Sequence, residues 1–171
     1  RIGHMTVCKN IPSVEIGRDS TIGSLNWITG FPYGTDSLHF KSDISRFPAL
    51  ILKEHSAITS RHMIDCTDTI TIGKFSTIAG IRSQFLTHSI NIGKARQEAM
   101  PIKIGEYCFI GTNSVVLKGS IVPNSCVVGA MSLINKEFDE EYSLYGGVPA
   151  RIIKSLSKNQ LYFNRQTGYI N

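Results

Sequence analysis

Aliphatic residues recur at every sixth position along one unbroken stretch of this chain, at Ile104, Ile110, Val116, Val122, Val128 and Ile134. Small residues follow four positions after most of them, at Cys108, Ser114, Ser120, Cys126 and Ser132. An α-helical face repeats near 3.6 residues and a half-buried strand near 2, so a period of six fits neither element. The pattern indicates a repeated coil in which each six-residue unit turns one corner, with three units making a turn of about 18 residues.

The period predicts an all-β fold, a single-stranded parallel β-helix with an aliphatic interior and protruding loops. Upstream, the repeat resumes at Leu52, Ile58, Ile64 and Ile70, then shifts by two residues at Ile72 and Ile78. Each shift predicts a loop or a changed corner. Residues 24–48 and 89–100 carry no repeat, and we expect them to protrude, because loops often hold substrate contacts. Apolar residues between 152 and 163 predict a short C-terminal helix that packs back on the coil.

The 171 residues have no linker-like segment, so we expect a single domain over residues 1–171. Residues 1–5 include Gly3-His4-Met5 and are expected to be a cloning remnant without structural weight. No apolar run reaches the length of a spanning helix, which predicts a soluble, cytoplasmic protein without a membrane span. The net charge of +5 comes from scattered basic residues without a nucleic-acid-binding motif, so we expect no nucleic-acid partner.

The four cysteines, Cys8, Cys66, Cys108 and Cys126, have no CxxC spacing. Two of them occupy the small-residue position of the repeat, which suits a free thiol packed as a small hydrophobe. We therefore predict neither disulfides nor a structural zinc site. The flat flanks of a β-helix are uncovered short strands, and association with copies of the same chain would bury them.

The sequence resembles a known family in four segments: residues 72–79 followed by Thr87-His88, residues 104–119, residues 128–132, and the Gly146-Gly147-Val148-Pro149-Ala150-Arg151 ending. Together they are similar to the left-handed β-helix hexapeptide acyltransferases, in the branch of galactoside, maltose, xenobiotic and polysaccharide O-acetyltransferases. The resemblance implies a left-handed coil, a homotrimer and acetyl-CoA as cosubstrate without a metal. It also implies transfer of acetyl to a hydroxyl of a sugar or glycan precursor.

His88 is the candidate catalytic base. Acetyl transfer to an alcohol needs a group that removes the hydroxyl proton during attack on the thioester, and imidazole is suited to this near neutral pH. We expect direct transfer, because no Cys or Ser accompanies His88 in a nucleophile motif.

The acceptor-binding candidates are Asp65, His62, Arg96 and Gln97. Asp65 matches an acidic position of the family and either orients the acceptor or the base, or serves as a turn carboxylate. His62 stands where the repeat prefers a small residue, so it either faces the cleft or is a hydrogen-bonded core imidazole. Arg96 and Gln97 belong to the loop that follows His88.

For the donor, the resemblance implies a coenzyme A groove between neighbouring copies, with basic residues near the nucleotide. By motif position, the residues expected to line it are Phe109, Gly111, Thr112, Ala130, Ser132, Asn135, Lys136, Arg151 and Lys154. Arg151 and Lys154 would point the same way on the predicted helix. Ala130 and Ser132 also fit ordinary packing of the coil.

Three other classes of protein share parts of this pattern. A γ-type carbonic anhydrase needs three zinc-binding histidines, and the spacing of His39, His55, His62 and His88 does not supply them. A non-catalytic β-helical assembly or sugar-binding module would need neither His88 nor the basic ending. A serine acetyltransferase-like enzyme is the alternative among enzymes. The sequence leaves the acceptor and the length of the acyl group open.

Overall fold

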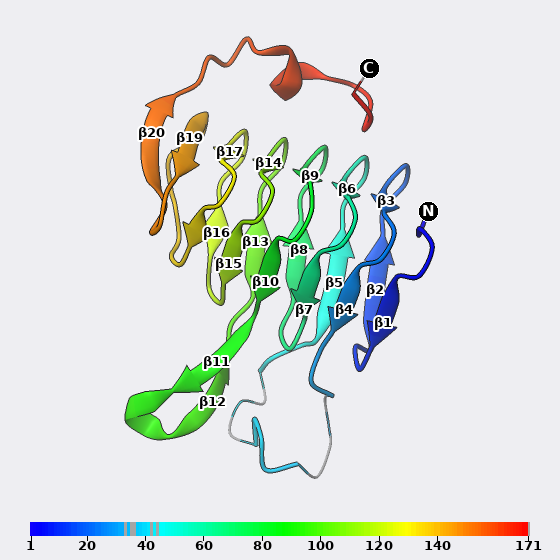
Figure 1. Ribbon diagram of the computed structural model, residues 1–171, viewed down its shortest axis with the longest axis vertical. Coiled ribbons are helices and arrows are strands. Elements are labelled where there is room, and N and C mark those ends of the chain that lie inside the picture. The colour runs from blue at the N-terminus through cyan, green and yellow to red at the C-terminus, as the bar shows by residue number, and fades with distance from the viewer. Residues whose placement is uncertain (33, 35–36, 42, 44, 171) are drawn as a thin grey trace.

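The computed structural model describes residues 1–32, 34, 37–41, 43 and 45–170. In this part of the chain, short strands follow one another around three corners and stack into three sheets (Figure 1). The six-stranded sheet has the order β1 (Val7–Lys9), β4 (Trp27–Thr29), β7 (Met63–Asp65), β10 (Gln84–Leu86), β15 (Val115–Leu117) and β18 (Leu133–Ile134). The five-stranded sheet has the order β16 (Ile121–Val122), β13 (Ile102–Ile104), β8 (Ile70–Ile72), β5 (Ala49–Leu52) and β2 (Ser13–Ile16).

The seven-stranded sheet forms the third face, in the order β20 (Arg151–Ser155), β19 (Ser143–Gly146), β17 (Val127–Val128), β14 (Phe109–Ile110), β9 (Thr77–Ile78), β6 (Ala57–Ile58) and β3 (Thr21–Ile22). A separate hairpin consists of β11 (His88–Asn91), the 3-10 turn η1 (Ile92–Lys94) and β12 (Arg96–Ala99). The fold is a single-stranded, left-handed parallel β-helix, as predicted.

The register confirms that three six-residue units make one turn. Ile104 pairs with Val122, Ile110 with Val128 and Val116 with Ile134, each in parallel. Every partner in these pairs lies 18 residues further along the chain. The six aliphatic residues of the repeat all point into the prism and are buried.

The small-residue positions are buried at the corners of the prism. The residue before each of them bends the chain with a positive φ, as at Tyr107, Asn113, Ser125 and Met131. This left-handed backbone costs roughly 1 kcal/mol or more at a non-glycine residue. It turns the next side chain inward, where only a small group fits, and the Ser76 hydroxyl there donates to the Gly105 carbonyl at 2.6 Å.

The interruptions of the repeat gather at one corner, between the six-stranded and five-stranded sheets. An insertion leaves the coil after β4, two extra residues follow β7, and the β11–β12 hairpin leaves after β10. Both Ile70 and Ile72 are buried, which explains the two-residue shift in the sequence pattern. Figure 1 shows the insertion and the hairpin projecting from the same edge of the coil. The sequence predicted an irregular segment at 24–48, but Trp27–Thr29 within this range forms a regular strand of the coil. Part of the predicted segment lies outside the described residues.

The predicted C-terminal helix is wrong. Residues 151–155 form β20, which runs antiparallel to β19 after a turn at Gly147 with φ +101°. Pairing with β19, at the open edge of the sheet, satisfies the backbone hydrogen-bonding groups of this segment, and its two isoleucines favour a strand over a helix. Only Leu161–Asn164 forms a single 3-10 turn, η2. The segment does pack back on the coil, because the Tyr162 hydroxyl donates to the Cys108 carbonyl at 3.0 Å (Figure 1).

The first residues of the chain take part in the coil, contrary to expectation. Ile2 forms a parallel bridge with Ile22, and the Gly3 N–H donates to the Ile22 carbonyl at 2.7 Å. These residues continue the stacking beside β3.

Thiol labelling tests the packing of the cysteines. All four are free; Cys66, Cys108 and Cys126 are buried, whereas Cys8 is exposed. Burial raises the pKa of Cys108 to about 12 and that of Cys126 to about 11, and it also raises the pKa of Cys66. Because the thiolate is the reactive form, we expect a soluble disulfide reagent to label only Cys8 in the native protein and all four after denaturation. Rapid labelling of a second thiol in the native protein would contradict this packing.

Candidate active site

Stacking of successive turns places His88 beside Asp65. Asp65 ends β7 and pairs with Leu86 of β10, and the chain continues through Thr87 to His88 at the start of β11. The His88 Nδ1 lies 2.6 Å from the Asp65 Oδ2. The His88 side chain is 39% exposed and that of Asp65 only 13%. The pair therefore joins a sheltered carboxylate to a solvent-accessible imidazole.

Asp65 is held by the turn that follows β7, which contains the two extra residues. Its Oδ1 accepts hydrogen bonds from the Thr67 N–H at 3.2 Å and the Thr67 hydroxyl at 2.7 Å. Its Oδ2 accepts one from the Thr87 N–H at 3.1 Å. Burial alone would raise the pKa of Asp65, but hydrogen bonds from His88 and the two threonines outweigh it and lower that pKa. Asp65 is thus both a turn carboxylate and a partner of His88, so the two sequence-based interpretations coincide.

This pairing selects one tautomer of His88. An ionised carboxylate only accepts hydrogen bonds, so the proton of the contact resides on His88 Nδ1. Nε2 then carries a lone pair, and the described residues place no hydrogen-bond donor on it. An imidazole oriented in this way can accept a proton at Nε2 from a bound hydroxyl.

His62 lies at another corner, between the seven-stranded and six-stranded sheets, and is only 2% exposed. Its Nδ1 accepts a hydrogen bond from the Ser83 N–H at 3.2 Å, and its Nε2 lies 2.9 Å from the Thr59 hydroxyl. Burial lowers the pKa of His62 to about 4. These contacts favour the core-imidazole interpretation over a role in acceptor binding.

Arg96 and Gln97 line a cavity of about 460 Å³ between the hairpin and the insertion. Arg96 also pairs with Glu98 at 3.3 Å, and the Gln97 Oε1 is buried without a hydrogen-bond partner among the described residues. The other lining side chains combine apolar and basic groups, Leu38, Phe40, Lys41 and Ile90 among them. The ring of Phe40 also contacts the ring of His88, with centroids 5.8 Å apart. The structure thus brings two of the acceptor candidates to a cavity that is also lined by Phe40, the residue in contact with the imidazole.

The donor-groove candidates near the thioester lie away from His88 in the same chain. Gly111, Thr112 and Ala130 occupy the corner between the seven-stranded and six-stranded sheets. Phe109 points out from the seven-stranded sheet and packs against Tyr162 at 6.1 Å between centroids. One chain alone does not bring these residues to His88. Ser132 is buried, and its hydroxyl donates to the Gly129 carbonyl at 2.7 Å, so its side chain serves the packing of the coil.

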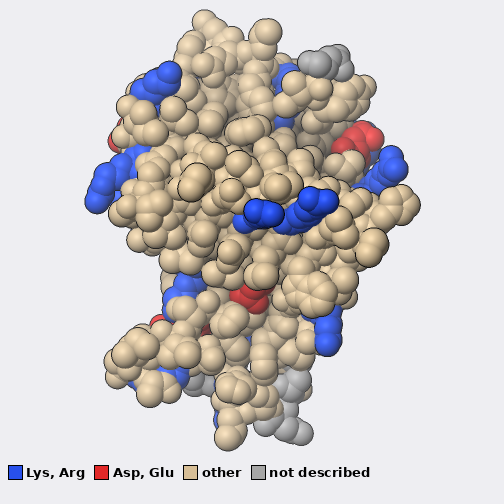
Figure 2. Space-filling view, viewed as in Figure 1, with Lys and Arg blue, Asp and Glu red and all other residues tan. Residues whose placement is uncertain are grey.

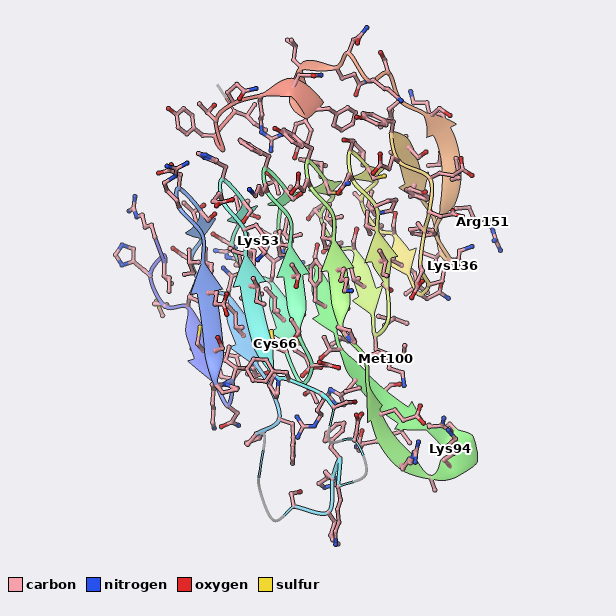
Figure 3. The ribbon with its side chains drawn as sticks, turned by 180° about the vertical axis from the view of Figure 1, so that it is seen from behind. Lys53, Cys66, Lys94, Met100, Lys136 and Arg151 are labelled. Atoms are coloured by element: carbon pink, nitrogen blue, oxygen red, sulfur yellow. The ribbon has the colours of Figure 1, made fainter. Side chains whose placement is uncertain are left out.

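The candidates for the nucleotide end are all exposed and lie at the C-terminal end of the coil. Figure 3 labels Lys136 and Arg151 there. Asn135 and Lys136 follow β18, whereas Arg151 and Lys154 belong to β20. Because β20 is a strand, the shared direction predicted for Arg151 and Lys154 from helical spacing is wrong.

Sequence reasoning missed Thr67, Thr87 and the contact from Phe40. The Asp65-x-Thr67 spacing is typical of a turn in which a carboxylate accepts from the residue two positions later, so it was a usable signal. Phe40 lies in the insertion without a repeat, and no pattern in the sequence pairs it with His88.

Sequence comparisons find short, closer matches and one longer, more distant match. The chain is 33% identical over 63 residues to the carnitine operon protein CaiE of Escherichia coli (strain K12), covering 36% of this chain and 32% of CaiE. It is 40% identical over 57 residues to the putative lipopolysaccharide biosynthesis O-acetyl transferase WbbJ of the same organism, covering 33% of this chain and 29% of WbbJ. It is 27% identical over 157 residues to the putative acetyltransferase YvoF of Bacillus subtilis (strain 168), covering 91% and 81% of the two chains.

Among solved structures, the hexapeptide-repeat containing acetyltransferase VCA0836 of Vibrio cholerae O1 biovar eltor, complexed with acetyl coenzyme A, superposes with a TM-score of 0.57. It is 26% identical, and the match covers 91% of this chain and 70% of that one. The matches to CaiE and WbbJ span only about a third of the length of those proteins. No protein-family model matches the sequence.

Two kinds of feature are absent from the described residues. None of their helices is long and apolar enough to cross a membrane. Their His, Cys, Asp and Glu side chains form no group of three that could hold a metal ion.

The buried His62 predicts a loss of stability in mild acid. Its pKa falls from 6.5 to about 4 on folding, so between these values the unfolded chain binds the proton more readily than the native one. The free energy of unfolding should therefore decrease by about 3 kcal/mol as the pH falls from 6.5 to 4, and the loss from His62 should level off below pH 4. His62→Asn cannot titrate, and Asn26 fills the equivalent position one turn earlier. Urea unfolding across this pH range should show a shallower slope for the variant; equal slopes would contradict the assignment.

Proposed function

We propose that this chain, whose fold and sequence similarities confirm the expected resemblance to hexapeptide-repeat acyltransferases, is an acetyl-CoA-dependent O-acetyltransferase. Its acceptor is a hydroxyl of a sugar or glycan precursor. The observation that carries the proposal is the 2.6 Å contact between the Asp65 Oδ2 and the His88 Nδ1, on an imidazole side chain that is 39% exposed and contacts Phe40 in the wall of a cavity. A cytoplasmic location, where acetyl-CoA is available, is part of the proposal.

His88 acts as the general base in this reaction. Nε2 takes the proton of the acceptor hydroxyl while the oxygen attacks the thioester carbonyl carbon. Asp65 stabilises the imidazolium that forms, because its carboxylate stays ionised at the 2.6 Å contact. When the tetrahedral intermediate collapses, the carbon–sulfur bond breaks and the departing thiolate takes the proton from Nε2. The products are the acetyl ester and free coenzyme A, and no acyl-enzyme forms.

The donor groove requires a neighbouring copy, because one chain holds the donor candidates and His88 at different corners. The outer face of the six-stranded sheet supports such an association. Trp27 and Met63 pair across β4 and β7, and each is 51% exposed. Pairing between neighbouring strands continues this line of side chains through Gln84 to Val115 and Leu133, and we call these five residues the apolar row after its four apolar members. Figure 2 shows a face of the coil that is mostly uncharged, with a few Lys or Arg side chains across its middle and at its margins. We expect three copies to bury this row in a closed ring, which would bring the Gly111 corner of one copy to the His88 corner of the next.

The cavity between hairpin and insertion is where the acceptor would lie. Its apolar side chains, Phe40 and Ile90 among them, suit the C–H faces of a sugar ring. Arg96, Lys41 and the amide of Gln97 offer hydrogen bonds to hydroxyl, carboxylate or phosphate oxygens. Similarity to WbbJ, a putative lipopolysaccharide O-acetyl transferase, also favours a glycan acceptor.

Substitution of the pair tests the mechanism. His88→Ala should lower kcat by a hundredfold or more, the usual scale for loss of a general base, with donor affinity unchanged. Asp65→Asn should also lower kcat strongly, because an amide can donate to Nδ1 and thereby favour the wrong tautomer. Release of free coenzyme A thiol, measured with a panel of nucleotide sugars and glycosides, reports the activity.

His55→Ala is the matched control for these variants. His55 stacks on Phe75 at 4.7 Å, at the corner between the five-stranded and seven-stranded sheets, and has no part in the proposed chemistry. It should retain wild-type kcat. Full activity in His88→Ala would remove His88 from the mechanism, and coenzyme A thermal shifts would confirm that each variant still binds the donor.

A charge placed on the apolar row tests the proposed trimer. Met63→Glu should give a monomer that keeps its β-rich circular dichroism but loses transfer activity, because the groove is then incomplete. Light scattering coupled to gel filtration measures the mass. Lys103→Glu is the control, since Lys103 is exposed on the five-stranded sheet and should leave the mass unchanged. A monomeric wild type with full activity would contradict the shared groove.

A further inference from the structure

The imidazole of His88 has a second contact, which comes from the insertion. The ring of Phe40 meets it edge to face, with centroids 5.8 Å apart and planes at 80°. The hydrogen bond from Nδ1 to Asp65 fixes one atom of the imidazole but leaves the ring free to pivot about that bond. A T-shaped aromatic contact restricts the plane of the ring. Phe40 and Asp65 together therefore determine where Nε2 lies.

Phe40 itself is held in an unfavourable backbone conformation. Its φ is +59°, in the left-handed region that costs roughly 1 kcal/mol or more for a bulky residue. Such a residue keeps this conformation only when its surroundings fix it. The ring is 8% exposed and packs against the ring of Phe31 at 5.3 Å and the guanidinium of Arg46 at 4.5 Å.

Arg46 connects this aromatic cluster to the Asp65 turn. It is only 6% exposed, and its guanidinium donates to the carbonyls of Phe31 at 2.9 Å, Pro32 at 2.8 Å and Thr67 at 3.1 Å. Thr67 is the residue whose N–H and hydroxyl hold Asp65. Burial lowers the pKa of Arg46, although the nearby Asp43 and Asp68 oppose this effect. One side chain thus ties the support of Phe40 to the support of Asp65.

The base of the insertion is anchored on the same turn. The Phe47 N–H donates to the Asp68 Oδ1 at 3.1 Å, and the Thr69 hydroxyl donates to the Phe47 carbonyl at 2.7 Å. Asp68 N–H in turn donates to the Thr87 hydroxyl at 2.9 Å. The insertion is therefore hydrogen-bonded to the turn that follows Asp65, and this turn is hydrogen-bonded to Thr87, the residue before His88.

We propose that Phe40 and Arg46 are positioning residues for His88. Arg46 locks the insertion onto the Thr67 turn, and Phe40 fixes the plane of the imidazole while its ring forms a wall of the 460 Å³ cavity. The insertion thereby couples the shape of the acceptor site to the orientation of the base. The catalytic consequence rests on the proposed function, whereas the orientation of the ring can be measured without it.

The first test removes the ring of Phe40 without changing its backbone. Phe40→Asn suits this purpose, because Asn tolerates the left-handed region. It should lower kcat ten- to a hundredfold, the scale expected when a reacting group is misplaced, and leave KM for acetyl-CoA unchanged. Phe40→Tyr keeps the ring and should lose much less kcat than Phe40→Asn. Unchanged kcat in Phe40→Asn, with an active wild type, would overturn the proposal and leave the proposed function standing.

The second test measures the NMR signals of the His88 imidazole directly, in protein with isotope-labelled histidine. Phe40→Asn should shift the His88 ring protons, because they lose the ring current of Phe40, and should broaden them; Phe40→Tyr should keep the wild-type positions. If the wild type transfers no acetyl group, the proposed function fails, and these resonances still decide whether Phe40 orients His88. Unmoved His88 resonances in Phe40→Asn would contradict the proposal.

Arg46→Lys tests the link from the insertion to the turn. A single ammonium cannot span three carbonyls as the planar guanidinium does, so the His88 resonances should shift as in Phe40→Asn. Arg18→Met is the control, because Arg18 is 80% exposed and lies between β2 and β3, at the corner between the five-stranded and seven-stranded sheets. A lower melting temperature in Arg46→Lys with unchanged His88 resonances and kcat would assign Arg46 a purely structural role. If Arg46→Lys does not fold, the two Phe40 variants decide the proposal.

Discussion

Parallel pairing of successive turns places every residue of the coil directly above a residue of the turn before. Successive turns lie in direct contact: a Cβ on Gly73 would lie 2.4 Å from the backbone of Gly105 in the next turn. Extra residues can therefore leave the prism only at its corners. In this chain the insertion, the two extra residues after β7 and the hairpin all leave at the corner between the six-stranded and five-stranded sheets. The stacking thus gathers these three irregular segments at one corner.

The Asp65–His88 pair is a direct consequence of this stacking. The turn after β7 orients Asp65 through Thr67, and the next turn of the coil sets Thr87 and His88 above it. Rigid strands on both sides hold the 2.6 Å contact, so little reorganisation is needed when the imidazole gains a proton. His62 shows the contrast. It has the same side chain at a regular corner, where it is enclosed and neutral with no access to a substrate.

The sequence predicted the parts of the structure that repeat. The six-residue period fixed the buried aliphatics and the length of a turn, and the shift between Ile64 and Ile72 marked the corner that holds Asp65. Prediction from the sequence failed for the segments that carry no repeat. Ile152 and Ile153 fit an amphipathic helix, but the open edge of β19 made a strand more favourable. The contacts of Phe40 with His88 and of Arg46 with Thr67 join residues that lie far apart in the sequence, and no local pattern records them. The donor groove could not be assembled from one chain, because its residues and His88 lie at separate corners.

The central claim is that Asp65 keeps the proton of the neutral His88 imidazole on Nδ1 and leaves Nε2 free as a base. Nitrogen-15 chemical shifts of the histidine ring, measured at neutral pH on the native protein, report this tautomer directly. The structure predicts a protonated Nδ1 and an unprotonated Nε2 in His88, and the opposite tautomer in His62, whose Nδ1 accepts from the Ser83 N–H. A His88 ring protonated at Nε2 and bare at Nδ1 would contradict the account.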